Sequence, residues 1–338
     1  MKAAVYFLMT LTSSLPLAAQ ANSAPQWHIE NSVVKAQLYL PDAAKGFYRG
    51  TRFDWSGVVG DLEYAGHSYY GPWFTQTDPT IPDFVYRGPD IVAGPCSAIT
   101  GPVEEFVAVG YEEAKPGGTF LKIGVGILRK PDDAAYSAYR LYDIVNGGKW
   151  SVKKSKDAVE FTQELEDAPS GYGYVYQKTI RLIAGKPEME MVHAFRNTGK
   201  RAIRTSVYDH NFLVLDKRTT GAGYTITLPF QISSSHPPER DLAEIRKNQI
   251  VFLRTFSGED RVYTTIDGFS NNPDDYKIRI ENTDAKAGMT ITGDRPLAKM
   301  ALWSIRSVVS LEPFVDISVE PQSHTSWRYV YQYDTLAR

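Results

Sequence analysis

Hydrophobic and polar residues alternate along much of this chain, and the alternation limits the possible folds more than any other feature of the sequence. Successive side chains of a β-strand point to opposite faces, so a period of two predicts strands that are buried on one face. In residues 188–195, one face carries Met189, Met191, His193 and Phe195. The same alternation recurs in residues 174–182, 222–228, 277–281, 299–305, 315–319 and 327–333. The pattern therefore predicts an all-β protein.

Turn-forming residues separate these segments. Gly, Asn and Pro cluster at residues 146–148, 184–187, 197–200 and 271–273, and such clusters favour reversals of the chain. Many strands joined by turns are typical of a large antiparallel β-sandwich or a barrel. Residues 241–249 have the best helical pattern, and we expect a short helix there. The chain has no internal repeat and no linker, so we expect residues 22–338 to form a single domain.

One region near the N-terminus is rich in proline and glycine. Between residues 70 and 102 the prolines are Pro72, Pro79, Pro82, Pro89, Pro95 and Pro102. Such a stretch usually crosses the surface as long loops, and long loops within a compact domain are often functional. We therefore expect an elaborated loop region here.

The first residues have the pattern of a secretory signal peptide. Lys2 provides a basic start, residues 3–19 are mostly apolar, and Ala19-Gln20-Ala21 fits a small-x-small cleavage site. We expect residues 1–21 to be removed after Ala21, and the mature protein to be periplasmic or secreted. A membrane anchor is the alternative, but the apolar run is short. Cys96 is the only cysteine, which excludes an internal disulfide and suits a bacterial periplasm or culture medium.

Charge and composition exclude several classes of function. The formal net charge is −2, with both signs interspersed, so neither nucleic acid nor an anionic membrane surface is an expected partner. The sequence contains no Cys/His cluster with the spacing of a zinc site. It also lacks a Gly-x-Ser-x-Gly elbow and the glycine patterns of nucleotide-binding loops. We expect no metal and no cofactor.

The order of several motifs resembles that of galactose mutarotase-like proteins, the superfamily that includes aldose 1-epimerases. Residues 174–182, followed along the chain by Tyr208-Asp209-His210-Asn211-Phe212-Leu213, are similar in their order to the central strands of that superfamily. The other segments that carry the resemblance are residues 32–40, 48–55, 101–106 and 310–314. The resemblance covers residues 32–333 and implies a large antiparallel β-sandwich that acts on carbohydrate.

The resemblance also implies two catalytic residues. Mutarotation needs an acid that protonates the ring oxygen and a base that takes the proton of the anomeric hydroxyl. His210, in the histidine strand, is the expected acid, and Glu312, in a Glu-Pro segment, is the expected base. Glu320 begins a second Glu-Pro pair and is the alternative base, although it falls in the turn before the last strand. A strand-end histidine bonded to backbone is the alternative for His210.

Further residues have side chains suited to binding a sugar. An arginine fork holds two hydroxyls or a carboxylate, aromatic rings stack on sugar faces, and carboxylates accept hydroxyl hydrogen bonds. Of Glu104 and Glu105, we expect one to point away. His193 shares a face with methionines and is expected to be buried. The predicted substrate-binding residues are Arg49, Arg52, His67, Tyr70, Trp73, Glu105 and Tyr208.

The chain departs from typical epimerases at two of these motifs, which keeps other functions open. Residues 101–105 have no histidine where epimerases carry His-Gly-Gly, and Asp209 replaces the asparagine before His210. Polysaccharide lyases and glycoside hydrolases use the same scaffold and are the first alternative to an aldose 1-epimerase-like isomerase. A non-catalytic carbohydrate-binding protein is the second. The expected partner is in every case a mono-, oligo- or polysaccharide.

Overall fold

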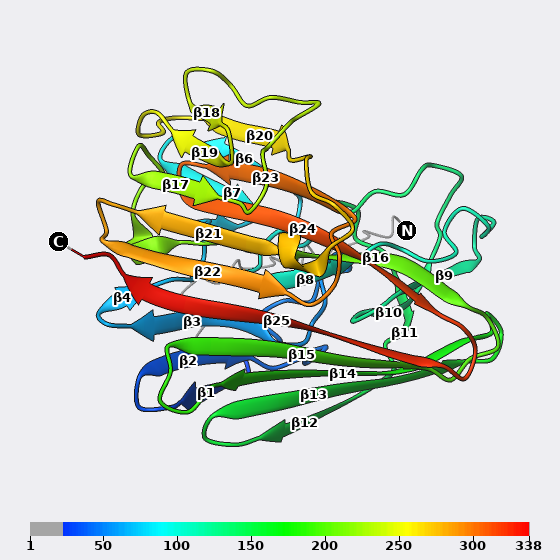
Figure 1. The fold of residues 1–338 in the computed structure, drawn as a ribbon. Helices are drawn as coiled ribbons and strands as arrows, with labels where there is room; N and C mark the ends of the chain where they lie inside the picture. The colour runs from blue at the N-terminus through cyan, green and yellow to red at the C-terminus, as the bar shows by residue number, and fades with distance from the viewer. Residues whose placement is uncertain (1–22, 338) are drawn as a thin grey trace, which may run out of the picture.

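The computed structural model describes residues 23–337. The predicted signal peptide, residues 1–21, lies outside the described residues. Two antiparallel sheets dominate the fold (Figure 1). The order of the ten-stranded sheet is β12 (Lys149–Lys154), β13 (Ala158–Asp167), β14 (Tyr172–Leu182), β15 (Glu188–Asn197), β25 (His324–Thr335), β22 (Ala287–Gly293), β21 (Lys277–Asn282), β17 (Tyr224–Thr227), β19 (Gln249–Phe252) and β18 (Ala243–Arg246). The order of the five-stranded sheet is β20 (Arg261–Thr265), β23 (Lys299–Ile305), β24 (Val308–Val319), β16 (Ile203–His210) and β8 (Val103–Phe106).

Three smaller sheets accompany this pair. The first has the order β1 (Gln26–Glu30), β2 (Val34–Tyr39), β3 (Val58–Tyr64) and β4 (His67–Ser68). The second has the order β5 (Gln76–Thr77), β7 (Asp90–Ala93) and β6 (Phe84–Arg87), and the third has the order β11 (Ile144–Asn146), β10 (Gly126–Arg129) and β9 (Thr119–Lys122). Two short 3₁₀ turns, η1 (Leu215–Lys217) and η2 (Pro273–Asp275), are the helical elements of the described chain. No helix among residues 23–337 is long and apolar enough to cross a membrane.

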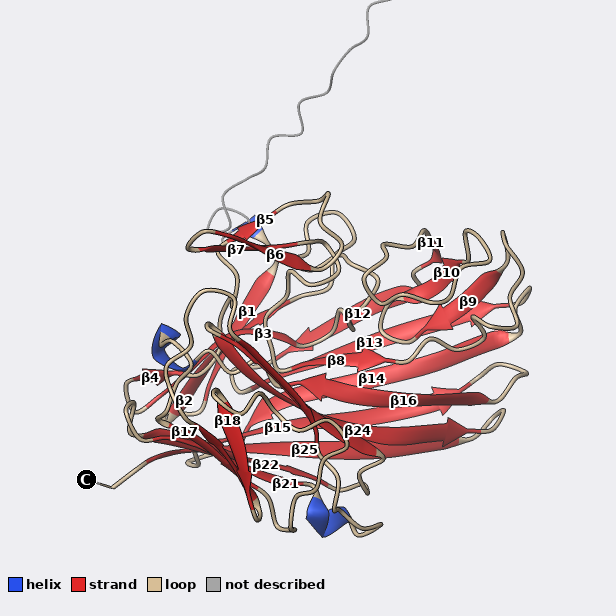
Figure 2. Cartoon of the chain, turned by 90° about the horizontal axis from the view of Figure 1, so that it is seen from above, coloured by secondary structure: helices blue, strands red, loops and turns tan. Residues whose placement is uncertain are grey.

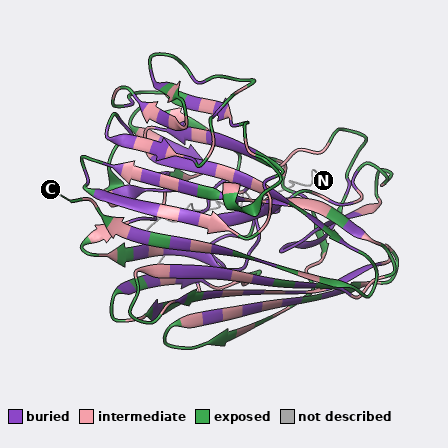
Figure 3. Ribbon diagram, in the orientation of Figure 1, coloured by how far each residue is buried: buried purple, intermediate pink, exposed green. Residues whose placement is uncertain are grey.

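The two large sheets pack face to face (Figure 2), and the core between them is rich in aromatic residues. Phe106 of the five-stranded sheet contacts Tyr176 and Trp327 of the ten-stranded sheet, with ring centroids 5.6 and 6.2 Å apart. Burial alternates along the strands, as the bands in Figure 3 show, because each strand turns every second side chain toward the core. The predicted all-β sandwich is therefore confirmed.

The expected helix at residues 241–249 is wrong. This segment contains β18 and the turn that leads into β19, and Ile245 pairs with Ile250 across the hairpin. Lys247 has a φ of +56°, which a right-handed helix excludes. Leu242 and Phe252 are buried, so pairing at the edge of the large sheet overrides the weak helical pattern. 

The region of residues 70–102 also differs from the expected long loops. It contains β5, β6 and β7, and β5 and β7 are parallel. This small sheet packs its aromatic side chains against the outer face of the five-stranded sheet. Trp73 contacts Phe84 at 5.4 Å and Trp303 of β23 at 5.6 Å. The N-terminal segments thus contribute most of a second hydrophobic cluster, separate from the core between the large sheets.

Candidate active site

The outer face of the five-stranded sheet carries the residues of the candidate site. On β16 and β24, Tyr208 pairs with Phe314, and the two rings stack 3.9 Å apart. Because side chains alternate, His210, two residues after Tyr208, and Glu312, two residues before Phe314, lie on this same face. Val207, one residue before Tyr208, turns to the core and is fully buried. The sheet register therefore brings the predicted acid and base together.

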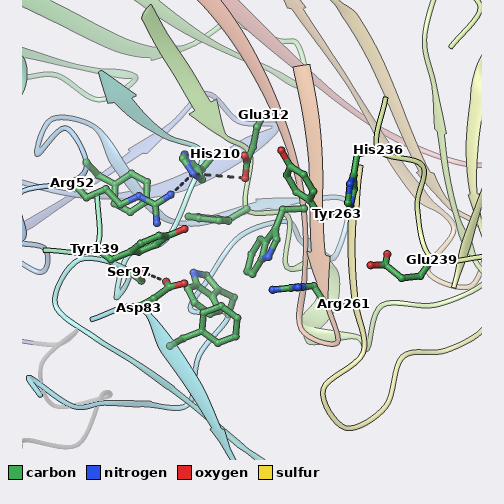
Figure 4. A pocket seen from close by; sticks show the side chains of 15 residues that line it. Arg52, Asp83, Ser97, Tyr139, His210, His236, Glu239, Arg261, Tyr263 and Glu312 are labelled. Carbon is green, nitrogen blue, oxygen red and sulfur yellow. Dashed lines mark hydrogen bonds and ion pairs between the residues drawn. The ribbon is translucent and has the colours of Figure 1, made fainter. Parts of the chain in front are cut away.

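Loops from the N-terminal half cover this face and leave a cavity of about 420 Å³. Arg52 and Phe53 come from the segment between β2 and β3, Tyr139 from the segment between β10 and β11, and Asp83 immediately precedes β6. Figure 4 shows these side chains arranged around the opening. The full lining is Arg52, Phe53, Trp73, Asp83, Phe84, Ser97, Tyr139, His210, Phe212, His236, Glu239, Arg261, Tyr263, Trp303 and Glu312.

Arg52 is held at the base of the cavity by a buried carboxylate. Its Nε lies 2.7 Å from Glu105 Oε2, and Tyr208 donates its hydroxyl proton to the same oxygen at 2.7 Å. Lys122 Nζ lies 3.2 Å from Glu105 Oε1. Burial raises the pKa of Glu105, but Lys122 and Arg52 outweigh it and lower that pKa to about 2. Glu105 thus holds Arg52 in place, and Tyr208 holds Glu105. Neither Glu105 nor Tyr208 lines the cavity.

His210 accepts a hydrogen bond from Arg52. The distance from Arg52 Nη2 to His210 Nε2 is 2.9 Å, and a guanidinium can only donate, so Nε2 must present its lone pair. Burial lowers the pKa of His210 well below its usual value, and Arg52 lowers it further. The ring is therefore neutral at neutral pH and carries its proton on Nδ1, which has no hydrogen-bond partner among residues 23–337.

Glu312 presents a carboxyl group that can gain or lose a proton near neutral pH. Its Oε1 lies 3.7 Å from His210 Nε2, and Ser310 Oγ donates to the same oxygen at 3.4 Å. Burial is the largest influence on Glu312 and raises its pKa to about 7. A carboxyl with this pKa, facing a cavity, suits general acid/base chemistry.

Several residues predicted from the sequence lie away from this cavity. Arg49 donates to the Ala44 carbonyl at 2.6 Å and lines a different hollow. His67 Nδ1 lies 2.8 Å from Asp216 Oδ2, also in another hollow. Tyr70 is buried, and its hydroxyl bonds that of Tyr333 at 3.0 Å.

The structure also shows where two other predicted residues, Trp73 and Glu320, lie. Trp73 does line the cavity, but it is 3% exposed and packs mainly against other aromatic rings. Glu320, the alternative base, is exposed at the far end of β24 and pairs with Arg204 at 2.6 Å. Glu312 is therefore the Glu-Pro carboxylate that faces the cavity.

Sequence reasoning missed several lining residues. Tyr263 and Trp303 are paired across β20 and β23. The alternation of residues 299–305 predicted the strand that carries Trp303, but it did not show that Trp303 lies on the cavity face of the sheet. Asp83 lies in the proline-rich region that was expected to be functional, but no motif marked it. Tyr139 comes from a loop with no recognisable pattern. The other missed residues are Phe53, Phe84, Ser97, Phe212, His236, Glu239 and Arg261.

A buried ion cluster, formed by Asp54, Glu104, Lys178 and His193, lies on the core side of the five-stranded sheet, where Glu104 of β8 meets side chains of β14 and β15. Lys178 Nζ is 2.9 Å from Asp54 Oδ2 and 2.6 Å from Glu104 Oε2. His193 Nε2 is 2.8 Å from Glu104 Oε2. All four side chains are almost completely buried, which confirms the prediction for His193. Glu104 points away from the cavity while Glu105 faces Arg52, as expected for consecutive strand residues.

No group of His, Cys, Asp and Glu side chains among residues 23–337 has the arrangement of a metal site. What the cavity offers is an ionisable carboxyl, a fixed arginine and histidine, and aromatic walls. This combination can bind a polar molecule that has apolar faces and can move a proton to or from it.

Comparison with known proteins identifies the fold. No family model matches this chain, and no curated protein matches it. A galactose mutarotase-like protein from Lactobacillus casei ATCC 334 aligns with a TM-score of 0.50 at 14% identity, over 91% of this chain and 100% of the other. A putative aldose 1-epimerase from Escherichia coli K12 gives 0.52 at 13% identity, over 92% and 99%. A GalM/aldose epimerase homologue from C. elegans gives 0.53 at 11% identity, over 93% and 100%. At such identities, the likeness concerns the fold.

Proposed function

We propose that this chain, which has the galactose mutarotase-like fold, interconverts the anomers of a sugar with Glu312 as the general base. The observation that carries this function is a carboxyl of pKa about 7 in a cavity with aromatic walls. The ionised Glu312 takes the proton of the anomeric hydroxyl, the bond between the anomeric carbon and the ring oxygen breaks, and the open chain recloses on either face.

Arg52 and His210 support this reaction as a positioning pair. The sequence predicted His210 as the acid, and that role stays a prediction. Nε2 accepts from Arg52 at 2.9 Å, and the proton of the neutral ring lies on Nδ1. His210 therefore holds the guanidinium toward the cavity, where Arg52 donates hydrogen bonds to sugar oxygens.

Direct measurement of anomer exchange tests the function. We expect the protein to accelerate equilibration of freshly dissolved α-anomers of at least one aldose among D-glucose, D-galactose, D-xylose and L-arabinose. Polarimetry and NMR exchange spectroscopy follow the rate against buffer alone. A well-folded protein that accelerates none of these sugars would rule out this function.

Hydrolysis of a glycosidic bond is the second candidate function. Three carboxyl groups, those of Asp83, Glu239 and Glu312, line the same cavity, and glycoside hydrolases use a pair of carboxyl groups as acid and base or nucleophile. New reducing ends released from neutral or acidic glycans would identify a hydrolase. An unsaturated uronate product, detected by its absorbance, would instead identify a lyase.

Trp303 provides a test of sugar binding that does not depend on turnover. The side chain is half-buried and lines the cavity from β23. We expect Trp303→Ala to weaken sugar binding by about 1–3 kcal/mol, because a stacking surface is lost. Trp27→Ala, on β1 and outside the cavity, is the matched control and should bind normally. Calorimetry with both variants measures the difference. Sugar binding without any turnover would support the carbohydrate-binding alternative.

Export is part of the proposal. Residues 1–21 have the sequence of a signal peptide, and we expect the mature chain in a bacterial periplasm or in the medium. N-terminal sequencing of the protein purified from its native host should begin at Asn22.

A further inference from the structure

The guanidinium of Arg52 has donors that the protein does not use. Its Nε donates to Glu105 Oε2 at 2.7 Å, and its Nη2 donates to His210 Nε2 at 2.9 Å. A guanidinium carries more N–H donors than these two bonds use. Nη1 forms no hydrogen bond with the residues that the structure describes. Because Arg52 lines the cavity, its remaining donors are available to an acceptor there.

Two aromatic rings lie against this guanidinium. Arg52 Cζ is 4.6 Å from the centroid of the Phe53 ring and 4.9 Å from that of the Tyr139 ring. At such distances a cation is attracted to the face of a ring. Phe53 is fully buried, whereas Tyr139 is 42% exposed and lies beside Arg52 at the cavity (Figure 4). The Arg52 side chain is only 11% exposed, so the Tyr139 ring covers it on a side that solvent would otherwise reach.

Thr51 joins the segment that carries Tyr139 to the segment that carries Arg52. The Thr51 side chain is buried. Its hydroxyl accepts a hydrogen bond from the Tyr142 backbone N–H at 3.2 Å and donates one to the Arg140 carbonyl at 3.3 Å. Thr51 immediately precedes Arg52, and Arg140 immediately follows Tyr139. One hydroxyl therefore fixes the two segments beside each other.

We propose that Tyr139 is a positioning residue, whose ring, held in place through Thr51, keeps the Arg52 guanidinium directed into the cavity. Its consequence for the sugar rests on the proposed function, in which Arg52 donates hydrogen bonds to sugar oxygens. The contact with Arg52 is made by the ring, so the Tyr139 hydroxyl is not needed. Direct stacking of Tyr139 on the sugar is the competing role, and it predicts no change in Arg52 when the ring is removed.

The side-chain nitrogen–proton NMR spectrum of the free protein tests this role without any sugar. The Arg52 Nε signal is identified by its absence from Arg52→Gln. We expect its hydrogen exchange with water to be roughly 3–30-fold faster in Tyr139→Leu than in wild type, because the bond to Glu105 opens more often without the ring. Tyr139→Phe should restore the wild-type rate. An unchanged rate in Tyr139→Leu would overturn the role of Tyr139.

Anomer exchange of D-glucose and D-galactose, also followed by NMR, tests the consequence for the sugar. Tyr139→Leu should raise KM by roughly 3–30-fold and change kcat by less than about threefold, because Arg52 holds the sugar both before and during the reaction. A partly unfolded variant would instead lose kcat at an unchanged KM. Thr51→Val, which removes the hydroxyl between the two segments, should raise KM by roughly 2–10-fold.

A double-substitution cycle with Arg52→Gln separates this role from direct stacking on the sugar. Without the guanidinium, Tyr139→Leu should lower kcat/KM by less than about twofold, since both substitutions remove the same contact. A loss as large as in the wild-type background would mean that the ring contacts the sugar itself, and the positioning role would be wrong.

Trp27→Leu is the matched control for an exposed ring beneath a cation. Lys154 Nζ lies 4.7 Å from the centroid of the Trp27 ring, which is 37% exposed and outside the cavity. This variant should leave KM, kcat and the Arg52 exchange rate unchanged. A wild-type protein without anomer exchange would overturn the proposed function, whereas the Arg52 exchange rate would still decide the role of Tyr139.

Discussion

Glu312→Gln is expected to lower kcat for anomer interconversion by roughly 10²–10⁴-fold, because glutamine cannot accept the proton of the anomeric hydroxyl. The wild-type rate should rise as the pH passes through about 7, the pKa to which burial raises Glu312. The ascending limb of the profile should be absent from the variant. Stopped-flow polarimetry across this range measures both effects. Glu320→Gln, the exposed Glu-Pro carboxylate, is the matched control and should behave as wild type.

The same substitution is expected to stabilise the protein at alkaline pH. A carboxyl with a raised folded-state pKa holds its proton more tightly in the folded chain, so ionising it costs stability as pH rises from about 4.5 to about 7. That shift corresponds to roughly 3 kcal/mol, and Glu312→Gln removes the cost. The variant should therefore be more stable than wild type at pH 8 and nearly equal at pH 4. Equal stability of the two proteins at pH 8, measured by urea unfolding, would contradict the raised pKa.

Lys178→Met is expected to destabilise the protein by about 3–5 kcal/mol, because it leaves Asp54 and Glu104 without their shared cation. Burial lowers the pKa of Lys178, but the two carboxylates outweigh it and raise that pKa above its usual value. The ammonium therefore stays charged over the whole accessible range. Urea unfolding at pH 7 gives the loss.

Lys153→Met is the control for a surface ion pair. Lys153 lies 2.7 Å from Glu160 on neighbouring strands, but its side chain is 79% exposed. Its removal should cost less than about 1 kcal/mol. A similar loss for both lysine variants would mean that the buried ion cluster contributes no more than an exposed pair does.

The sequence predicted the strands well because their alternation is local. A period of two shows which side chains share a face. It places His210 and Glu312 on one face once β16 and β24 pair. Alternation does not state which face is covered, or by what. Tyr70 looked like a sugar platform, but its segment passes into the core, where it meets Tyr333.

The residues supplied by loops were beyond prediction for a related reason. Asp83 and Tyr139 reach the cavity only because the small sheet and the segment after β10 fold back over the five-stranded sheet. No local pattern encodes such long-range packing. The contact between Arg52 and His210 joins residues far apart in the chain, and it changes the chemistry expected of the histidine.

The consecutive pairs Glu104–Glu105 and Asp209–His210 have a consequence for how this protein tolerates insertions and deletions. The first member of each pair faces the core and the second faces the outside of the five-stranded sheet. Adding or deleting one residue within β8 or β16 would exchange the two faces. In β8, such a change would turn Glu105, which binds Arg52, toward the core and would turn Glu104 toward the outer face. Length variants within these two strands should therefore be lost from a mutational library even where many single substitutions survive.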